Sequence, residues 1–159
     1  MTTLNMQRPH TSISIANKIK SADLIHSIFQ SAYRVEADLI GVQSFPPLER
    51  KVSEIRASEN TFYAAMQDDT CLGIMEIEKS KETTVIVSLA VRPFHSRQGV
   101  GRLLVQFILE QNSSVVVTTA EKNLPAINLY EKLGFTKTNE FSTSEGIRMV
   151  ELEARLPTS

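Results

Sequence analysis

The stretch VIVSLAVRPFHSRQGVGRLLVQFILEQ, residues 85–111, decides how the chain is expected to fold. Its first part, Val85–Val91, is an apolar, β-branched run of strand length. A turn segment that contains Pro93 and Gly99 follows. From Val100 onward, apolar residues recur at i, i+3, i+4, i+7 and i+8, which is the spacing of one helix face. The predicted order is therefore strand, glycine-containing loop and helix.

The loop before this predicted helix has the composition of an anion-binding site. The first N–H groups of a helix lack partners within the helix and carry partial positive charge. Gly99 and Gly101 have no Cβ atoms, so the backbone can take a positive φ and a ligand can approach it closely. Arg97 and Arg102 add full charges on either side. The segment is predicted to bind an anion such as a phosphate, although a glycine turn that only starts a helix gives the same pattern.

Two common phosphate loops do not match this stretch. The dinucleotide fingerprint needs a third glycine at the position of Leu104. The P-loop ends in Gly-Lys-Ser/Thr, whereas Gly101 is followed by Arg102 and Leu103. A plain nucleotide binder for NAD or ATP remains an alternative, but the absent third glycine argues against it.

The bulk properties are those of a soluble globular protein. The 159 residues suit a single domain over residues 11–159, preceded by a loose tail at residues 1–10. The net charge of −1 disfavours a nucleic-acid surface, and no apolar run reaches membrane-spanning length. The one cysteine, Cys71, excludes an internal disulfide and fits a reducing, cytoplasmic compartment. The polar N-terminus does not have the pattern of a signal peptide.

The remaining segments predict an α/β chain with a mixed sheet. Ser21 is expected to cap a helix that ends near Gly41, and Pro46-Pro47 to open a second helix that runs through Ile55. The apolar run at residues 115–117 predicts a strand that is buried on both faces and lies parallel to the first one. The last two strands should form a hairpin around the STSEG turn. Further strands are expected at Thr11–Ala16, Thr61–Gln67, Cys71–Glu78, Ser114–Thr119, Thr136–Phe141 and Ile147–Leu156.

A second informative stretch is NLPAINLYEKLGF, residues 123–135. Pro125 lies where the first turn of a helix would be, with Asn123 or Leu124 as the cap. Gly134 is expected to end that helix, with Phe135 folding back onto it. By itself this pattern indicates a short, well-capped helix with a half-buried tyrosine.

Together the two stretches resemble the GCN5-related N-acetyltransferase (GNAT) family, over about residues 61–156. The resemblance implies one GNAT-like α/β (α+β) domain, with a mixed, mostly antiparallel sheet of about seven strands and about four helices. It also implies acetyl-CoA (coenzyme A) as cofactor and transfer of the acetyl group to a primary amine of a small molecule or peptide. A homodimer would fit the same resemblance, and neither a nucleic acid nor a membrane is an expected partner.

The resemblance assigns cofactor contacts by position. The family binds the pyrophosphate through backbone N–H groups of a Q/R-x-x-G-x-G/A loop, and here Ser96 replaces the usual Gln or Arg. The backbone of the strand end would pair with the pantetheine arm, and one N–H there would polarise the thioester carbonyl. The implied cofactor residues are Leu89, Ala90, Val91, Ser96, Arg97, Gln98, Gly99, Val100, Gly101, Arg102, Asn123, Ala126 and Tyr130.

The implied chemistry is direct attack of a neutral amine on the thioester. Tyr130 matches the family's tyrosine near the sulfur, and a phenol that stays protonated at neutral pH can donate to a leaving thiolate. Cys71 as a nucleophile is the competing idea, but it lies in a predicted strand with no identifiable partner base, so it is expected to be a buried structural thiol. Glu76 is either a candidate general base or a solvated strand charge, and Ser88 could order a water.

The acceptor amine itself is not readable from the sequence. By resemblance, its site is formed by the first helices and the last hairpin, which points to Tyr33, Glu36, Phe45 and the STSEG turn. Glu36 and Asp38 would either bind a cationic substrate or be plain helix-surface charges. Two alternatives stay open: acetylation of a protein N-terminus, such as that of a ribosomal protein, and a catalytically silent CoA-binding module.

Overall fold

A computed structural model describes residues 10–93 and 99–156 of the chain. Its strands form one seven-stranded sheet in the order β1-β2-β3-β4-β5-β7-β6. The β4–β5 pair is parallel and the other five pairs are antiparallel, as the mixed-sheet prediction requires. The strands are β1 (Thr11–Ile15), β2 (Thr61–Gln67), β3 (Thr70–Lys79), β4 (Thr84–Val91), β5 (Ser114–Ala120), β6 (Thr136–Ser142) and β7 (Arg148–Arg155).

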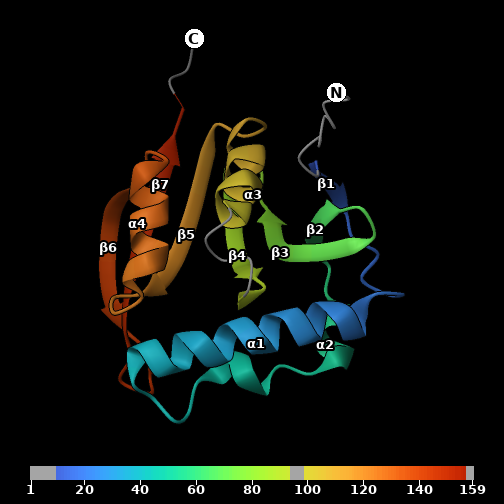
Figure 1. Ribbon diagram of the computed structural model, residues 1–159. Coiled ribbons are helices and arrows are strands. Elements are labelled where there is room, and N and C mark those ends of the chain that lie inside the picture. Colours follow the sequence, from blue (N-terminus) through green and yellow to red (C-terminus); the bar gives the residue numbers. More distant parts are fainter. Residues whose placement is uncertain (1–9, 94–98, 157–159) are drawn as a thin grey trace, which may run out of the picture.

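Helices cover both faces of this sheet. They are α1 (Ala22–Ile40), the 3-10 helix η1 (Pro46–Glu49), α2 (Val52–Ala57), α3 (Val100–Leu109) and α4 (Leu124–Lys132). In Figure 1, α1 runs crosswise to α3 and α4. Of the predicted tail, residues 1–9 lie outside the described residues.

The alternating faces of the strands produce two apolar cores. Phe62 and Ala64 of β2 pack with α1 and α2, while Ala65 packs with α3 on the opposite face. The first core is centred on fully buried side chains such as Phe29, and the second on Leu104. The helices expected from 3.6-residue periodicity therefore pack through the faces that the sequence marks as apolar.

The central strands β4 and β5 pair over only part of their length. Their parallel ladder joins residues 84–86 to residues 115–117. Beyond that point β4 continues to Val91 and β5 to Ala120, but no further β4–β5 pair follows among the described residues. The two strands therefore diverge, and the β5-facing edge of β4 is left without a strand partner.

The prediction of one helix that starts at Pro46-Pro47 and runs through Ile55 is wrong in one respect. The segment forms two separate helices, η1 and α2. Arg50 has φ −64° and ψ 129°, an extended conformation that interrupts the helix between η1 and α2. The Arg50 guanidinium is hydrogen-bonded to the carboxylate of Glu76 on β3. The residue that interrupts the helix is thus the one that makes the ion pair with β3.

Two smaller expectations also needed correction. Ser21 lies at the N-cap of α1 but its side chain makes no capping hydrogen bond. The turn before α1 uses Asn17 instead, whose Oδ1 accepts hydrogen bonds from the backbone N–H groups of Ile19 and Lys20. Val116 is only partly buried, so β5 is not covered completely on both faces.

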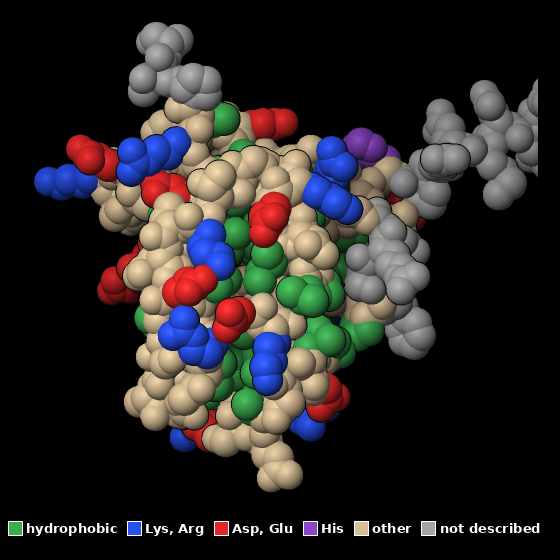
Figure 2. Space-filling view, turned by 90° about the vertical axis from the view of Figure 1, so that its left-hand side faces the viewer, with side chains coloured by type: hydrophobic (Ala, Val, Ile, Leu, Met, Phe, Trp, Pro, Cys, Tyr) green, Lys and Arg blue, Asp and Glu red, His purple; other side chains and the backbone are tan. Residues whose placement is uncertain are grey.

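Charges of both signs are mixed on the face formed by β6 and α4. Figure 2 shows Lys and Arg side chains interspersed with Asp and Glu there, without a large patch of one sign. Lys137 and Arg148 each pair with Glu140 on this surface. In the described part of the chain, no helix combines the length and the apolar character needed to cross a bilayer.

Candidate active site

The N-terminus of α3 has the geometry predicted from the two glycines. Gly99 lies just before the helix with φ 75° and ψ 16°, a left-handed conformation that favours glycine. The first hydrogen bond of the helix runs from the Leu103 N–H to the Gly99 carbonyl, at 3.0 Å. The N–H groups of residues 100–102 therefore have no partner within the helix and can bind an anion. Ser96, Arg97 and Gln98 lie outside the described residues.

Gly101 also has a packing role that the sequence did not reveal. A Cβ atom at this position would come within 3.3 Å of Leu129 Cδ2 on α4 and 3.7 Å of Val91 Cγ2. The small residue thus lets α3 approach α4 and β4 closely. The neighbouring Val100 side chain is buried in the core, so only its backbone can face a ligand.

A groove runs between α1, the end of β4 and the start of α4, and we call it the α1 groove. Its cavity volume is about 590 Å³. Most of its surface is apolar, and its largest side chains come from α1 and from Leu89 and Val91 of β4. It is lined by Ala32, Val35, Glu36, Leu39, Leu89, Val91, Pro93, Asn123 and Pro125.

A second, smaller cavity occupies the gap where β4 and β5 diverge, and we call it the β4–β5 pocket. Its volume is about 290 Å³. Side chains from α1, η1, β4, β5, α4 and the β6–β7 turn surround it. The lining residues include the predicted Tyr33, Glu36, Phe45, Ser88, Leu89, Asn123, Ala126 and Tyr130, together with Pro46, Pro47, Ile86, Val87, Val117, Thr118, Thr119, Thr143, Glu145, Ile147 and Met149.

The two cavities meet at three shared residues. Glu36, Leu89 and Asn123 line both the α1 groove and the β4–β5 pocket. They come from α1, β4 and the start of α4, which are far apart in the sequence. A long molecule in the groove and a second molecule in the pocket would therefore come together beside these three side chains.

The second motif holds Tyr130 in the wall of the β4–β5 pocket through both ends of α4. At the start, Asn123 Oδ1 accepts a hydrogen bond from the Ala126 N–H at 3.3 Å, the predicted N-cap. At the end, Gly134 has φ 95° and the Phe135 N–H donates to the Tyr130 carbonyl at 3.0 Å. The Phe135 ring packs against the Tyr130 ring with centroids 5.3 Å apart, as expected for this helix end.

The environment of Tyr130 keeps its phenol protonated. Burial raises the pKa of Tyr130, and the negative charge of Glu36 raises this pKa further. Among the described residues, no hydrogen bond to the Tyr130 hydroxyl offsets these two effects. At neutral pH the side chain is therefore a proton donor at the pocket wall.

Tyr33 and Ser88 form a second hydroxyl pair in the pocket. The Tyr33 hydroxyl donates to Ser88 Oγ at 2.6 Å. Burial raises the pKa of Tyr33 to about 12, although the hydrogen bond to Ser88 lowers it. Because Ser88 Oγ accepts this hydrogen bond, the Ser88 hydroxyl can itself donate a hydrogen bond to another acceptor, such as an ordered water.

The structure does not bring Glu76 into either cavity. Its side chain is 1% exposed, and its Oε1 and Oε2 accept hydrogen bonds from Arg50 at 2.5 and 3.0 Å. Asn60 donates to the same carboxylate at 2.8 Å, and Ser58 at 3.5 Å. Glu76 is therefore neither a free base nor a solvated strand charge, because all of these donors hold it against α2 and the loop after it.

Three other predicted residues have side chains outside the two cavities. Ala90 is 1% exposed and packs in the core, so any ligand contact would use its backbone. Cys71 is buried, and burial raises the pKa of its thiol, which makes it a poor nucleophile. Asp38 is exposed on α1, unlike the partly buried Glu36 two residues earlier.

The β5 side of the pocket was not among the predicted site residues. Thr118 and Thr119 line it, directly after the run of valines that pairs with β4. The change from Val117 to Thr118 in β5 coincides with the end of its pairing with β4. That signal is readable only when the register between β4 and β5 is known.

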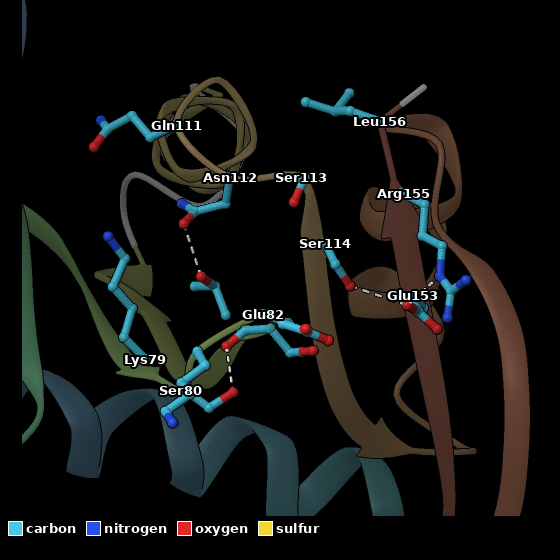
Figure 3. A pocket seen from close by; sticks show the side chains of 13 residues that line it. Lys79, Ser80, Glu82, Gln111, Asn112, Ser113, Ser114, Glu153, Arg155 and Leu156 are labelled. Atoms are coloured by element: carbon cyan, nitrogen blue, oxygen red, sulfur yellow. Dashed lines mark hydrogen bonds and ion pairs between the residues drawn. The ribbon is translucent and has the colours of Figure 1, made fainter. Parts of the chain in front are cut away.

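A third cavity lies at the opposite, paired end of β4 and β5, and we call it the polar basin (Figure 3). Its volume of about 800 Å³ is larger than that of either other cavity. Its polar groups bond mainly to each other: Thr84 Oγ1 donates to Asn112 at 2.8 Å, and Ser114 Oγ donates to Glu153 at 3.0 Å. Arg155 also pairs with Glu153, at 2.7 Å. These hydroxyl, amide and guanidinium groups of the basin therefore already have partners, whereas no hydrogen bond from a described residue engages the Tyr130 hydroxyl in the β4–β5 pocket.

Comparison with known proteins gives a family match that spans most of the chain. The family model described as "Acetyltransferase (GNAT) family" matches residues 23–135. The match covers nearly all of α1, all of β4 and β5, the N-terminus of α3 and all of α4, so it includes most of the residues that line the two cavities.

Curated relatives and solved structures agree with this match. The chain is 32% identical to the Bacillus subtilis "UPF0157 protein YqkA" over 87% of its own length, but it spans only 39% of that relative. It is 26% identical to the "Peptidyl-lysine N-acetyltransferase YjaB" of Salmonella typhimurium, over 75% of this chain and 72% of that one. The structure of yncA, a putative acetyltransferase from Salmonella typhimurium with its cofactor acetyl-CoA, superposes with a TM-score of 0.71 at 16% identity, covering 94% of this chain and 95% of that one.

Proposed function

Because this chain belongs to the GNAT family of acetyltransferases, we propose that it transfers an acetyl group from acetyl-CoA to a primary amine of a peptide or small molecule. One observation carries the proposal: the α1 groove and the β4–β5 pocket share Glu36, Leu89 and Asn123, and Tyr130 lines the pocket. The α1 groove would bind the acyl donor, and the β4–β5 pocket would bind the acceptor amine. Their junction is where the thioester and the amine would react.

Features of the α1 groove and of the start of α3 suit the successive parts of acetyl-CoA. The free N–H groups at the start of α3, preceded by Gly99 in its left-handed conformation, suit the pyrophosphate. The apolar walls from Val35, Leu39 and Val91 suit the pantetheine arm. The unpaired edge of β4 offers backbone groups to the amides of that arm. A structural relative, yncA, carries acetyl-CoA as its cofactor.

The reaction needs no covalent enzyme intermediate. A neutral amine in the β4–β5 pocket attacks the thioester carbonyl, and a backbone N–H near Leu89 stabilises the oxygen as it gains negative charge. Tyr130 lines the pocket with a protonated phenol, so it can donate its proton to the leaving thiolate. Holding donor and acceptor in adjoining cavities supplies the proximity on which such a direct transfer depends.

A lysine side chain is the acceptor class that the observations favour. The relative YjaB is named a peptidyl-lysine N-acetyltransferase. The β4–β5 pocket is narrow, and the described residues that line it include two carboxylates, Glu36 and Glu145, but no Lys, Arg or His. A pocket with this balance of charge attracts an alkylammonium and repels an anionic acceptor.

An acetyl-transfer assay tests this proposal. The protein is incubated with acetyl-CoA and one of two peptides: one with a blocked α-amine and a free lysine, the other with a free α-amine and no lysine. Free thiol release is followed, and the acetylated atom is located by mass spectrometry. We expect release with the lysine peptide and a modified side chain. Modification of the α-amine alone would favour N-terminal acetylation, and CoA binding without transfer to any amine would indicate a silent CoA-binding module.

A further inference from the structure

We propose that Glu36 is the general base, the group that takes a proton from the incoming ammonium before it attacks. This inference rests on the proposed function and adds to it the proton acceptor. An alkylammonium has no lone pair, so a direct transfer requires such a group within reach of the reacting nitrogen. Four observations lead to Glu36.

The first observation is the position of Glu36 in the two cavities. Among the described residues, it is the only carboxylate that lines both the α1 groove and the β4–β5 pocket. The amine must meet the thioester at the boundary between the two. A base at this boundary is beside the reacting nitrogen, whereas a base at the pocket mouth is not.

The second observation is the way Asn123 orients this carboxylate. Asn123 uses Oδ1 to cap α4 through the Ala126 N–H. The side-chain amide can then donate, and its hydrogen bond to Glu36 favours the ionised form of that carboxylate. Asn123 is thus a positioning residue that joins the start of α4 to α1 and holds the Glu36 carboxylate where the two cavities meet.

The third observation is that the other candidate bases are unsuitable. The carboxylate of Glu76 is held by Arg50, Asn60 and Ser58 outside both cavities. Glu145 is exposed in the β6–β7 turn, where hydrogen bonds from that turn lower its pKa and make it a weaker base. Tyr33, with a pKa of about 12, remains protonated at neutral pH.

The fourth observation is the electrostatic setting of Glu36. Burial raises the pKa of Glu36, and the hydrogen bond from Asn123 lowers it in part, so the carboxylate is a stronger base than an exposed one. Among the described residues, the titratable groups that share the pocket with it are Tyr33 from the same helix, Tyr130 from α4 and Glu145 from the turn. None of these carries a positive charge that would weaken the base.

Glu36 and Tyr130 are also coupled through charge. The ionised Glu36 disfavours a negative phenolate at Tyr130. Once Glu36 has taken the proton of the ammonium it is neutral, and this penalty is removed. Proton uptake by Glu36 therefore makes proton donation by Tyr130 easier. This coupling favours the order in which the amine is deprotonated first and the thiolate is protonated second.

The protons balance over one cycle. The ammonium gives one proton to Glu36, and the neutral nitrogen forms a bond to the thioester carbon. The carbon–sulfur bond then breaks, and the thiolate takes the Tyr130 proton. The amide nitrogen loses its second proton to the Tyr130 phenolate, and Glu36 releases its proton to water. The net products are the acetylated amine, CoA thiol and one proton.

The pH dependence of a Glu36→Gln variant tests this assignment. With a lysine peptide at pH 7, we expect kcat/KM to fall about 10²-fold or more, with acetyl-CoA affinity unchanged. The wild-type kcat/KM should reach a plateau above the pKa of Glu36. The variant should have no such plateau, and its kcat/KM should keep rising toward the pKa of the amine, because only the neutral amine reacts. Asp38→Asn, an exposed carboxylate on the same helix, is the matched control and should behave as wild type.

Two further measurements separate catalysis from a structural effect. A peptide analogue with an aminooxy group in place of the lysine amine is neutral at pH 7, so Glu36→Gln should lose far less activity with it. Asn123→Asp keeps the helix cap but places a second negative charge beside Glu36, so the acidic limb of the profile should move to higher pH. An active wild type whose Glu36→Gln variant keeps its plateau and its rate would overturn this inference alone. A wild type inactive on all amines would instead overturn the proposed function.

Discussion

The two ends of the β4–β5 pair carry cavities of opposite character. At the paired end, the polar basin has a volume of about 800 Å³, yet its threonine, asparagine, serine and arginine side chains bond to neighbours (Figure 3). At the diverging end, the β4–β5 pocket measures about 290 Å³ but has an unpaired strand edge and a protonated phenol. Polar groups that can still bind a ligand, and not the volume of the cavity, therefore identify the reactive region.

The reason for this difference is the short parallel ladder. Where β4 and β5 are joined, main-chain groups satisfy one another and the adjoining loops do the same. Where the strands separate, α1, α4 and the β6–β7 turn surround the gap, and among the described residues no hydrogen bond engages the Tyr130 hydroxyl there.

The largest effect is expected from removing the phenol of Tyr130. Tyr130→Phe should lower kcat by about 10²-fold or more, because the leaving thiolate loses its proton donor, while CoA affinity is retained. The matched change in the basin, Ser114→Ala, removes a hydroxyl of similar hydrogen-bonding capacity and should leave kcat unchanged. Steady-state kinetics with isothermal titration of CoA gives both quantities. Equal kcat values for Tyr130→Phe and wild type would remove Tyr130 from the mechanism.

A second comparison uses two Arg–Glu pairs that differ in burial. Glu76→Gln leaves the Arg50 guanidinium, whose side chain is 20% exposed, without its charged partner. We expect the free energy of unfolding to fall by about 3 kcal/mol. In the basin, Glu153→Gln breaks a pair whose arginine is 79% exposed, and the cost should stay below about 1 kcal/mol. Urea unfolding monitored by circular dichroism measures both, and a similar cost for the two variants would contradict the structural role given to Glu76.

A third comparison separates backbone strain from ligand contact. Gly99 and Gly41 both have left-handed backbones, and neither has an atom within 4 Å of an added Cβ. A valine at either position should cost about 1–2 kcal/mol of stability. Only Gly99→Val should also weaken acetyl-CoA binding, by about tenfold or more, because its side chain would lie at the N-terminus of α3. Isothermal titration calorimetry measures the acetyl-CoA affinity of both variants. An affinity of Gly99→Val equal to that of wild type would rule out an anion site at the start of α3.

The smallest effect concerns stability and pH. The pKa of Glu36 is raised on folding, so the folded state holds this proton more tightly than the unfolded state. Its contribution to stability is therefore present at low pH and is lost as the pH rises through the raised pKa. Glu36→Gln lacks this titration, so relative to wild type it should gain stability between acidic and neutral pH. Urea unfolding at several pH values tests the sign, and a relative loss of stability by the variant would contradict it.

Local signals in the sequence predicted the parts of the site that depend on neighbouring residues. Gly99 follows an apolar strand and precedes a helical stripe, so its left-handed turn and the free N–H groups after it were predictable. Asn123, Pro125 and Gly134 similarly mark both ends of α4 and thereby place Tyr130. The parallel β4–β5 pair followed from the long crossover between two apolar strands.

Features that depend on distant residues were not predictable in the same way. The ion pair of Glu76 joins it to Arg50, 26 residues away, and nothing near Glu76 in the sequence indicates that partner. The same pair interrupts the helix expected after Pro46. Glu36 was expected in the acceptor site, but its contact with Asn123 and its effect on Tyr130 follow only from the packing of α1 against α4.

The most direct test of the central claim is the change in backbone amide NMR shifts when CoA is added to the isotopically labelled protein. The account predicts large changes at Val100, Gly101 and Arg102 and along β4 from Leu89 to Val91, with little change in the polar basin. Large changes at residues 79–84 and 111–114, with none at the start of α3, would show that the cofactor binds at the paired end of the strands and would contradict the account.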